Sequence, residues 1–245
     1  MEIRGFIENS LLEWEGKIAC VVFVPRCNLR CKYCHAAHLL GATKLENIEQ
    51  EQILSYMRQH AGWVDGAVIT GGEPTLRKGE LVDFCEKVQD AGLEVMLETN
   101  GTQPYWIKRL LTEGAIQAIT MDVKAPLRKE EYSRVTDRNV EVDDLKRSME
   151  LIMEADIPYE FRITVVPDLV GEDELRRMAP DLEGAEKVAL QNFQPDNCLD
   201  STLQEVFPYT PEQMDHLASQ LQGVDEVVVR GRERGITVRS DRQAG

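Results

Sequence analysis

Residues 18–24 read Ile-Ala-Cys-Val-Val-Phe-Val, a continuous run of apolar side chains. A short run without polar alternation is typical of a strand that is buried on both faces, as the strands of parallel sheets are. Five further runs share this character: Gly66–Thr70, Glu94–Glu98, Ile116–Asp122, Tyr159–Val166 and Lys187–Gln191. Longer segments lie between them, so the pattern predicts repeated βα units and a parallel sheet.

The longer segments place apolar residues three and four positions apart, as one buried face of a helix requires. Helices are therefore predicted at Ile48–His60, Gly79–Ala91, Pro104–Thr112, Val142–Ala155 and Asp173–Ala179. Only six βα units precede a change of pattern at Asn192. A closed barrel of the TIM type needs eight, so the sequence predicts an α/β fold with an incomplete (β/α)6 barrel.

The end of the chain predicts a short C-terminal extension to that barrel. Gln194–Tyr209 is rich in turn residues, and a helix at Pro211–Leu221 and a strand at Glu226–Arg230 are expected after it. No Ser-, Pro- or Gly-rich linker separates these parts. We therefore expect one domain over residues 1–245, with a core at about 16–195 and the extension at about 196–245.

Composition excludes several classes of protein. The chain has 245 residues, 28 Lys and Arg against 43 Asp and Glu, and a net charge of −15, which disfavours nucleic acid as a partner. No stretch approaches the ~20 apolar residues of a membrane span, and charges are spread through the N-terminal segment. The sequence thus predicts a cytoplasmic protein with no membrane partner. Six cysteines are too few for a secreted disulfide scaffold.

Three of those cysteines, Cys27, Cys31 and Cys34, follow the first predicted strand with the spacing C-x3-C-x2-C. Three thiolates on one short loop can bind a metal centre, although Fe–S clusters usually take four cysteines. A cluster on three cysteines would leave one iron open to a substrate or cofactor, as catalytic zinc sites leave a position open. A Cys3His zinc site with His35 or His38 as fourth ligand is the alternative.

The other three cysteines are poor candidates for a fourth ligand. Cys20 lies inside a predicted buried strand, Cys85 lies on the apolar face of a predicted helix, and Cys198 is far along the chain. We therefore expect these three to be bystanders.

Polar residues and glycines gather at the carboxyl ends of the predicted strands, where parallel α/β folds build their active sites. They are Gly71, Gly72 and Glu73 after the second strand, Glu98, Thr99 and Asn100 at the end of the third, Asp122 and Lys124 at the end of the fourth, and Gln191 in the sixth. Arg162 stands inside the fifth, apolar strand and needs a carboxylate partner, for which Glu98 and Asp122 are candidates.

These segments together resemble a known family. The cysteine loop resembles the signature C-x3-C-x-Φ-C of radical S-adenosylmethionine (SAM) enzymes, with Tyr33 as the aromatic residue Φ, and Thr70–Pro74 resembles the family's GGEP motif. Glu98–Gly101 and Met121–Pro126 are similar to segments of glycyl-radical-enzyme activases. The resemblance covers almost the whole chain and is closest to anaerobic ribonucleoside-triphosphate reductase activating proteins.

The resemblance implies a set of cofactor contacts. Cys27, Cys31 and Cys34 would bind one [4Fe–4S] cluster, whose open iron chelates the methionine end of SAM. The side chains and backbone around SAM would be those of Tyr33, Gly71, Gly72, Glu73, Glu98, Thr99, Asn100, Asp122, Lys124, Arg162 and Gln191, with a monovalent cation as a further option. For Arg162 a structural ion pair, and for Gln191 the capping of a loop, are open alternatives. No catalytic side chain is expected, because cluster and SAM carry the chemistry.

The implied reaction begins with one electron from a reduced flavodoxin, ferredoxin or similar donor. SAM is cleaved to methionine and a 5′-deoxyadenosyl radical, which takes a hydrogen atom from a glycine Cα of a partner, the anaerobic ribonucleotide reductase. Three alternatives stay open: a small-molecule radical SAM enzyme such as 7-carboxy-7-deazaguanine synthase, an activase of another glycyl radical enzyme, and a non-catalytic zinc or Fe–S module.

Overall fold

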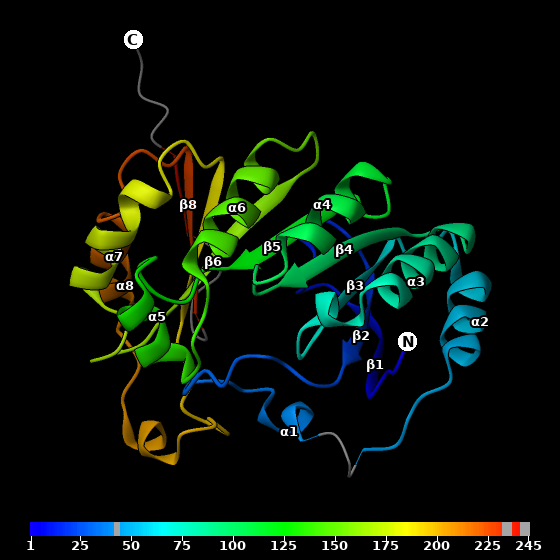
Figure 1. Cartoon of the computed structure of the whole chain (residues 1–245), viewed down its shortest axis with the longest axis horizontal. Helices are drawn as coiled ribbons and strands as arrows, with labels where there is room; N and C mark the ends of the chain where they lie inside the picture. The colour runs from blue at the N-terminus through cyan, green and yellow to red at the C-terminus, as the bar shows by residue number, and fades with distance from the viewer. Residues whose placement is uncertain (42–44, 232–236, 241–245) are drawn as a thin grey trace. The chain divides into compact units, whose positions relative to one another are not determined.

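The computed structural model describes residues 1–41, 45–231 and 237–240, the last four by their backbone alone. Its strands form one open, mostly parallel sheet whose order follows the chain from β1 to β9 (Figure 1). The pairs β2–β3–β4 and β6–β7–β8 are parallel, whereas β1–β2 and β8–β9 are antiparallel. The predicted α/β class with an unclosed barrel is therefore confirmed. No helix in the described ranges is long and apolar enough to cross a membrane.

The chain divides into two compact units. The first comprises Met1–Asn28, Ala36–Thr120 and Glu154–Pro158, and the second comprises Leu29–His35, Met121–Met153 and Tyr159–Gly245. Strand β5 (Ala118–Asp122) begins in the first unit and ends in the second. A single domain over the whole chain stays a prediction, so the units are described one at a time.

The first unit contains four strands and the helices between them. Their bounds are β1 Gly5–Ser10, β2 Ala19–Val24, α1 Ala37–Leu40, α2 Gln50–His60, β3 Gly66–Gly71, the 3-10 helix η2 Pro74–Arg77, α3 Gly79–Asp90, β4 Glu94–Thr99 and α4 Pro104–Thr112. Helices α2 and α3 lie side by side (Figure 1). Because β2 pairs with β3 from Ala19↔Gly66 to Val24↔Gly71, the two strands end at the same level. The loops after them therefore start next to each other.

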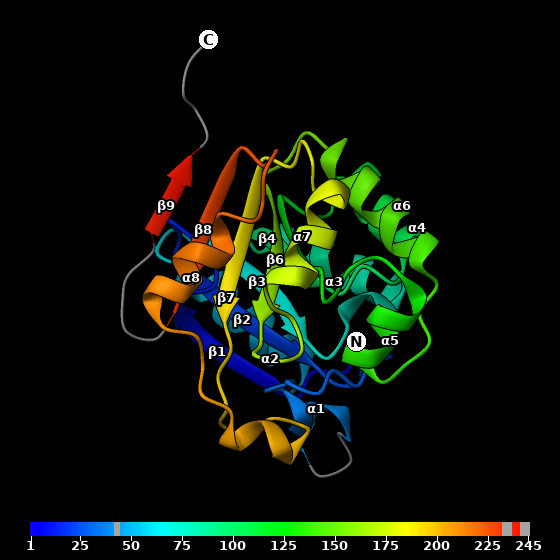
Figure 2. The ribbon, with the colours of Figure 1, turned by 90° about the vertical axis from the view of Figure 1, so that its left-hand side faces the viewer.

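The second unit contains the remaining elements. They are α5 Lys129–Thr136, α6 Val142–Met153, β6 Tyr159–Val165, α7 Glu172–Met178, η3 Ala179–Asp181, β7 Lys187–Asn192, η4 Ser201–Glu205, α8 Pro211–Ala218, β8 Glu226–Arg230 and β9 Thr237–Ser240. Helix α8 contacts β7 and β8, and β9 follows β8 at the edge (Figure 2). The predicted extension thus adds two strands to the sheet.

All seven predicted strands and all six predicted helices are present, with ends shifted by a few residues. The sequence missed β1, β9, α1 and α5. Strand β1 is half-exposed along its length, so it lacks a continuous apolar run. Helix α5 reads Lys-Glu-Glu-Tyr-Ser-Arg-Val-Thr and buries only its last residues and Tyr132, too few to show helical periodicity. Helix α1 has only four residues.

Gly66 offers a test of the packing beneath the first unit's strands. A Cβ at this position would lie 2.6 Å from the Trp14 ring and 3.0 Å from the Glu94 carbonyl oxygen, and Trp14 is part of a buried cluster. We expect Gly66→Ala to lower the free energy of unfolding by about 1–3 kcal/mol, the usual cost of overpacking. Urea unfolding followed by circular dichroism measures the change.

Gly79→Ala is the matched control, because a Cβ there meets nothing within 4 Å and Gly79 is the first residue of α3. Its urea midpoint should stay the same or rise slightly. Equal midpoints for the two variants would contradict this description of the core.

Candidate functional site

The turn after β3 packs against the start of the cysteine loop. The N–H of Gly72 donates to the Val24 carbonyl at 2.7 Å, and the N–H of Glu73 donates to the Arg26 carbonyl at 2.8 Å. A Cβ on Gly71, whose φ is +116°, would lie 2.5 Å from the Val24 oxygen, and one on Gly72 would overlap the Arg26 carbonyl. Glycine is needed at both positions because only a chain without Cβ admits this close approach. The two glycines thus place the loop that carries Cys27.

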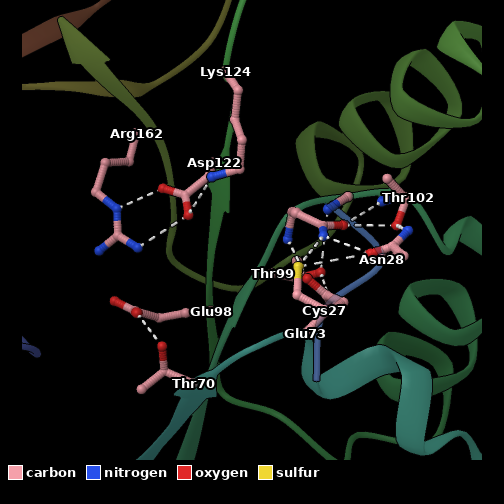
Figure 3. A network of polar contacts seen from close by, with 12 residues as sticks. Cys27, Asn28, Thr70, Glu73, Glu98, Thr99, Thr102, Asp122, Lys124 and Arg162 are labelled. Carbon is pink, nitrogen blue, oxygen red and sulfur yellow. Dashed lines mark hydrogen bonds and ion pairs between the residues drawn. The ribbon is translucent and has the colours of Figure 1, made fainter. Parts of the chain in front are cut away.

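Glu73 is the centre of a buried hydrogen-bond network (Figure 3). Its side chain is 1% exposed. Oε1 accepts from the Thr75 N–H at 3.1 Å, the Thr75 hydroxyl at 2.5 Å and the Thr99 hydroxyl at 2.7 Å, and Oε2 accepts from the Asn100 N–H at 2.7 Å. Burial raises the pKa of Glu73, while the four donors oppose that rise. The carboxylate therefore ties the end of β4 to the turn after β3.

A closed ring of three side chains lies beside Cys27. The Asn100 amide nitrogen donates to Asn28 Oδ1 at 3.0 Å, the Asn28 amide nitrogen donates to Thr102 Oγ1 at 2.8 Å, and the Thr102 hydroxyl donates to Asn100 Oδ1 at 2.7 Å. The Asn100 amide nitrogen also lies 3.6 Å from the Cys27 sulfur. Asn28 and Thr102 were not among the predicted site residues, because no single-residue signal separates them from ordinary loop residues.

Glu98 lies near the end of β4 and is buried, with 8% of its surface exposed. The Thr70 hydroxyl donates to its Oε2 at 2.7 Å, which joins the ends of β3 and β4 a second time. Thus the predicted residues Glu73, Glu98, Thr99 and Asn100 all lie in the first unit at the carboxyl end of its strands.

In the second unit, Asp122 lies between two cations. Arg162 Nε donates to Oδ1 at 2.7 Å, and Lys124 Nζ donates to Oδ2 at 3.2 Å (Figure 3). Burial alone would raise the pKa of Asp122, but Arg162 and Lys124 outweigh burial and hold that pKa well below its usual range. The predicted need of Arg162 for a carboxylate is confirmed, and of the two candidates Asp122 is an observed partner.

The part of the cysteine loop that carries Cys31 and Cys34 belongs to the second unit and is anchored on both sides. The N–H groups of Arg30 and Lys32 donate to carbonyls in the last turn of α5, at 2.8 and 3.2 Å. On the other side, the Asp200 N–H donates to the Lys32 carbonyl at 2.9 Å, and His35 Nδ1 lies 2.9 Å from the Asp196 carbonyl oxygen. Helix α5 and the 196–200 segment therefore fix this loop, although neither was assigned that role from sequence.

Between the two cysteines the chain makes a tight turn, in which the Cys34 N–H donates to the Cys31 carbonyl at 3.0 Å. Cys31 and Tyr33 are buried, and burial raises the pKa of the Tyr33 hydroxyl well above its ordinary value. Gln191 is half-buried near the end of β7, where its backbone pairs with Thr164 and Arg230.

All six cysteines lie in the described part of the chain, and none forms a disulfide there. Cys20 in β2 and Cys85 in α3 are fully buried, and burial raises the pKa of each thiol to about 12. Cys198 is also buried, with its sulfur 3.3 Å from the Gln194 carbonyl oxygen. Over residues 1–41 and 45–231, no three His, Cys, Asp or Glu side chains are gathered so as to hold a single metal ion.

Comparison with known proteins gives one family. A model described as the Radical SAM superfamily matches residues 21–179, more than half of the chain. A Methanocaldococcus jannaschii protein named "Putative glycyl-radical enzyme activating enzyme" is 26% identical over 236 residues, which cover 93% of this chain and 95% of that protein. A 7-carboxy-7-deazaguanine synthase of Thermoplasma acidophilum is 31% identical over 147 residues, 60% of this chain and 65% of that protein.

Among solved structures, Streptococcus suis SuiB bound to its precursor peptide SuiA is similar in fold. The TM-score is 0.66 at 11% identity, over 87% of this chain and 48% of that one. At this identity the likeness concerns the fold alone.

The charge cluster around Asp122 predicts a dependence of stability on pH. Asp122→Asn leaves Arg162 and Lys124 without this carboxylate. We expect the free energy of unfolding to fall by about 2–3 kcal/mol at pH 7. This is less than the cost of breaking a fully buried ion pair, because the three side chains are 13–23% exposed. The folded-state pKa is lowered, so the carboxylate's contribution is complete above the unfolded pKa of about 3.9 and is lost as the pH falls further.

The difference in unfolding free energy between wild type and Asp122→Asn should therefore be constant from pH 7 to about 5 and shrink below about 4. Urea unfolding at each pH measures it. The exposed Asp137, at the αL end of α5, supplies the control Asp137→Asn, which should change little at any pH. A difference for Asp122→Asn that stays constant down to pH 3 would contradict the assigned ion pairs.

Proposed function

Because the chain belongs to the radical SAM superfamily, we propose that it cleaves SAM at a [4Fe–4S] cluster and forms a glycyl radical on a partner enzyme. Membership of this family supports an enzyme with radical chemistry and a need for the cluster and SAM. The proposal that the radical is formed on a glycine of a partner enzyme rests on the likeness to a protein named as a glycyl-radical enzyme activating enzyme. That likeness extends over 93% of the chain.

The donor set fits the cluster. Cys27, Cys31 and Cys34 are thiols, the usual ligands of Fe–S clusters, and we propose that these three bind it. Both halves of their loop are held by backbone hydrogen bonds, one half by the turn after β3 and the other by α5. When bound, the cluster would supply the electron that breaks a carbon–sulfur bond of SAM.

The protein's share is to bind and orient the cofactor. The methionine end of SAM carries an ammonium and a carboxylate, and Lys124 and Arg162 offer cations suited to the carboxylate. Both already donate hydrogen bonds to Asp122, which orients them. We propose that Tyr33, Gly71, Gly72, Glu98, Thr99, Asn100 and Gln191 contribute further contacts to the cofactor, and that a monovalent cation can join Asp122.

Glu73 has a different part in this proposal. Its two oxygens already accept four hydrogen bonds and its side chain is 1% exposed, so little of it is open to a ligand. Glu73 would act mainly by holding Thr99 and Asn100 in place, with one remaining lone pair on Oε2 open to the ammonium group of SAM.

The proposed partner is an anaerobic ribonucleotide reductase, and the proposed donor of the electron is a flavodoxin, ferredoxin or similar protein. Both would meet the enzyme in the cytoplasm. The choice of reductase rests on three segments, residues 65–76, 159–170 and 189–200, which in this order resemble those of activases of this reductase. The Thermoplasma acidophilum relative favours one second candidate, 7-carboxy-7-deazaguanine synthesis. For that reaction we would expect binding of a pterin and no partner protein.

One experiment tests the proposal and separates the two candidates. The protein is reconstituted with iron and sulfide without oxygen, reduced with dithionite and supplied with SAM. We expect a [4Fe–4S]⁺ EPR signal and release of methionine. With a candidate reductase added, a glycyl radical doublet should appear, whereas the alternative would instead show turnover of a reduced pterin and no doublet.

Variants of the cysteines give the controls. Cys27→Ala, Cys31→Ala and Cys34→Ala should each abolish SAM cleavage, while Cys85→Ala, in the core of α3, should retain it. Wild-type protein that takes up zinc instead of iron and leaves SAM intact would contradict the enzyme assignment.

A further inference from the structure

We propose that Asn100 is a positioning residue that directs an N–H at the Cys27 sulfur and so sets the reduction potential of the cluster. This inference rests on the proposed function and adds a role for three residues, Asn28, Asn100 and Thr102, in one ring beside a single cluster ligand. Every contact that carries it lies within the first unit of the chain.

The ring fixes which way the Asn100 amide points. The backbone N–H of Thr102 lies 3.1 Å from Asn100 Oδ1, and a backbone N–H can only donate. The Thr102 hydroxyl approaches the same oxygen at 2.7 Å. The oxygen of the amide therefore faces Thr102, and the NH₂ group faces Asn28 and Cys27.

The two hydrogens of that NH₂ group have separate acceptors. Asn28 Oδ1 takes one at 3.0 Å, and the Cys27 sulfur, 3.6 Å away, takes the other. Asn28 is held in turn, because its own amide nitrogen donates to the Thr102 hydroxyl at 2.8 Å. In such a closed ring each hydrogen bond polarises the next, so the N–H directed at sulfur is a better donor than an isolated amide.

The backbone beneath the ring is held as firmly as its side chains. The Asn100 N–H donates to buried Glu73, and the Gly101 N–H lies 3.2 Å from the Thr99 hydroxyl. Asn100 is 4% and Thr102 is 7% exposed. Water therefore competes little for these groups, and the donor stays in place when the charge on the sulfur changes.

A fixed donor at a cluster ligand favours the reduced state. Reduction adds one electron, and with it one negative charge that spreads onto the thiolate sulfurs, and an N–H dipole stabilises that charge. In the low-dielectric site around Asn100 the effect is larger than in water. The structure thus assigns Asn100 a part in making the cluster reducible by a biological electron donor.

The test is an EPR-monitored titration of the reconstituted protein with dithionite, which supplies single electrons. Asn100→Leu removes the donor, and we expect the equilibrium constant for one-electron reduction to fall by up to about tenfold, equivalent to a shift of about 59 mV to lower potential. Asn9→Leu is the control, because Asn9 is exposed and lies on β1 beside the start of β2, whereas Cys27 follows the other end of β2. Its potential should equal that of wild type.

Thr102 supplies a pair of variants that leave Asn100 itself intact. Thr102→Val opens the ring and should shift the potential in the same direction by a smaller amount, and Thr102→Ser, which keeps the hydroxyl, should restore it. Iron content and circular dichroism report whether each variant is folded and loaded. If Asn100 and Thr102 served folding alone, the reduction potential of the cluster-loaded protein would be the same in wild type and in every Asn100 and Thr102 variant.

The outcomes separate this inference from the proposed function. Wild type that binds no [4Fe–4S] cluster would overturn the proposed function. Wild type that binds a cluster and cleaves SAM, with the same potential in Asn100→Leu and Thr102→Val, would overturn the role of Asn100 alone. If Asn100→Leu does not load, the Thr102 pair decides the question.

Discussion

The site depends on one buried carboxylate with four donors. Glu73 takes hydrogen bonds from two backbone N–H groups and two hydroxyls, drawn from the turn after β3 and from the end of β4. A buried carboxylate is costly unless it is satisfied, and each buried donor left without it would cost about 1–3 kcal/mol. All four partners are donors, so an acceptor-only group fits this position better than any neutral side chain.

The rest of the first unit's site follows from that constraint. The same turn uses Gly71 and Gly72 to let Val24 and Arg26 approach, which places the loop bearing Cys27. The same strand end presents Asn100, whose backbone binds Glu73 and whose side chain reaches the Cys27 sulfur. In the second unit, Asp122 accepts hydrogen bonds from Arg162 and Lys124 and so holds both side chains in place. Both sets are charged groups held in place by polar partners before any ligand arrives.

Much of this arrangement was predictable, because it follows from strand ends. Continuous apolar runs located β2 to β7, and within the first unit the polar residues at the strand ends, such as Glu73 and Glu98, had to gather at one edge of a parallel sheet. The ring of Asn28 and Thr102 was not predictable, since it depends on side-chain orientations that no spacing encodes. Helix α5 was missed because few of its residues are buried, although its last turn holds the loop of Cys31. The contact of Gly71 and Gly72 with SAM stays a prediction, and their close approach to Val24 and Arg26 was not foreseen, because spacing does not show which backbone segments meet.

Amide hydrogen exchange at Asn100, compared between wild type and Glu73→Gln, tests most directly whether Glu73 holds the end of β4 in place. The Asn100 N–H is buried and bound to Glu73 Oε2 at 2.7 Å, so it should exchange slowly in wild type. In Glu73→Gln it should exchange much faster, while the Val68 amide in the centre of β3 stays protected. Unchanged protection of the Asn100 N–H in the variant would show that Glu73 does not hold the end of β4.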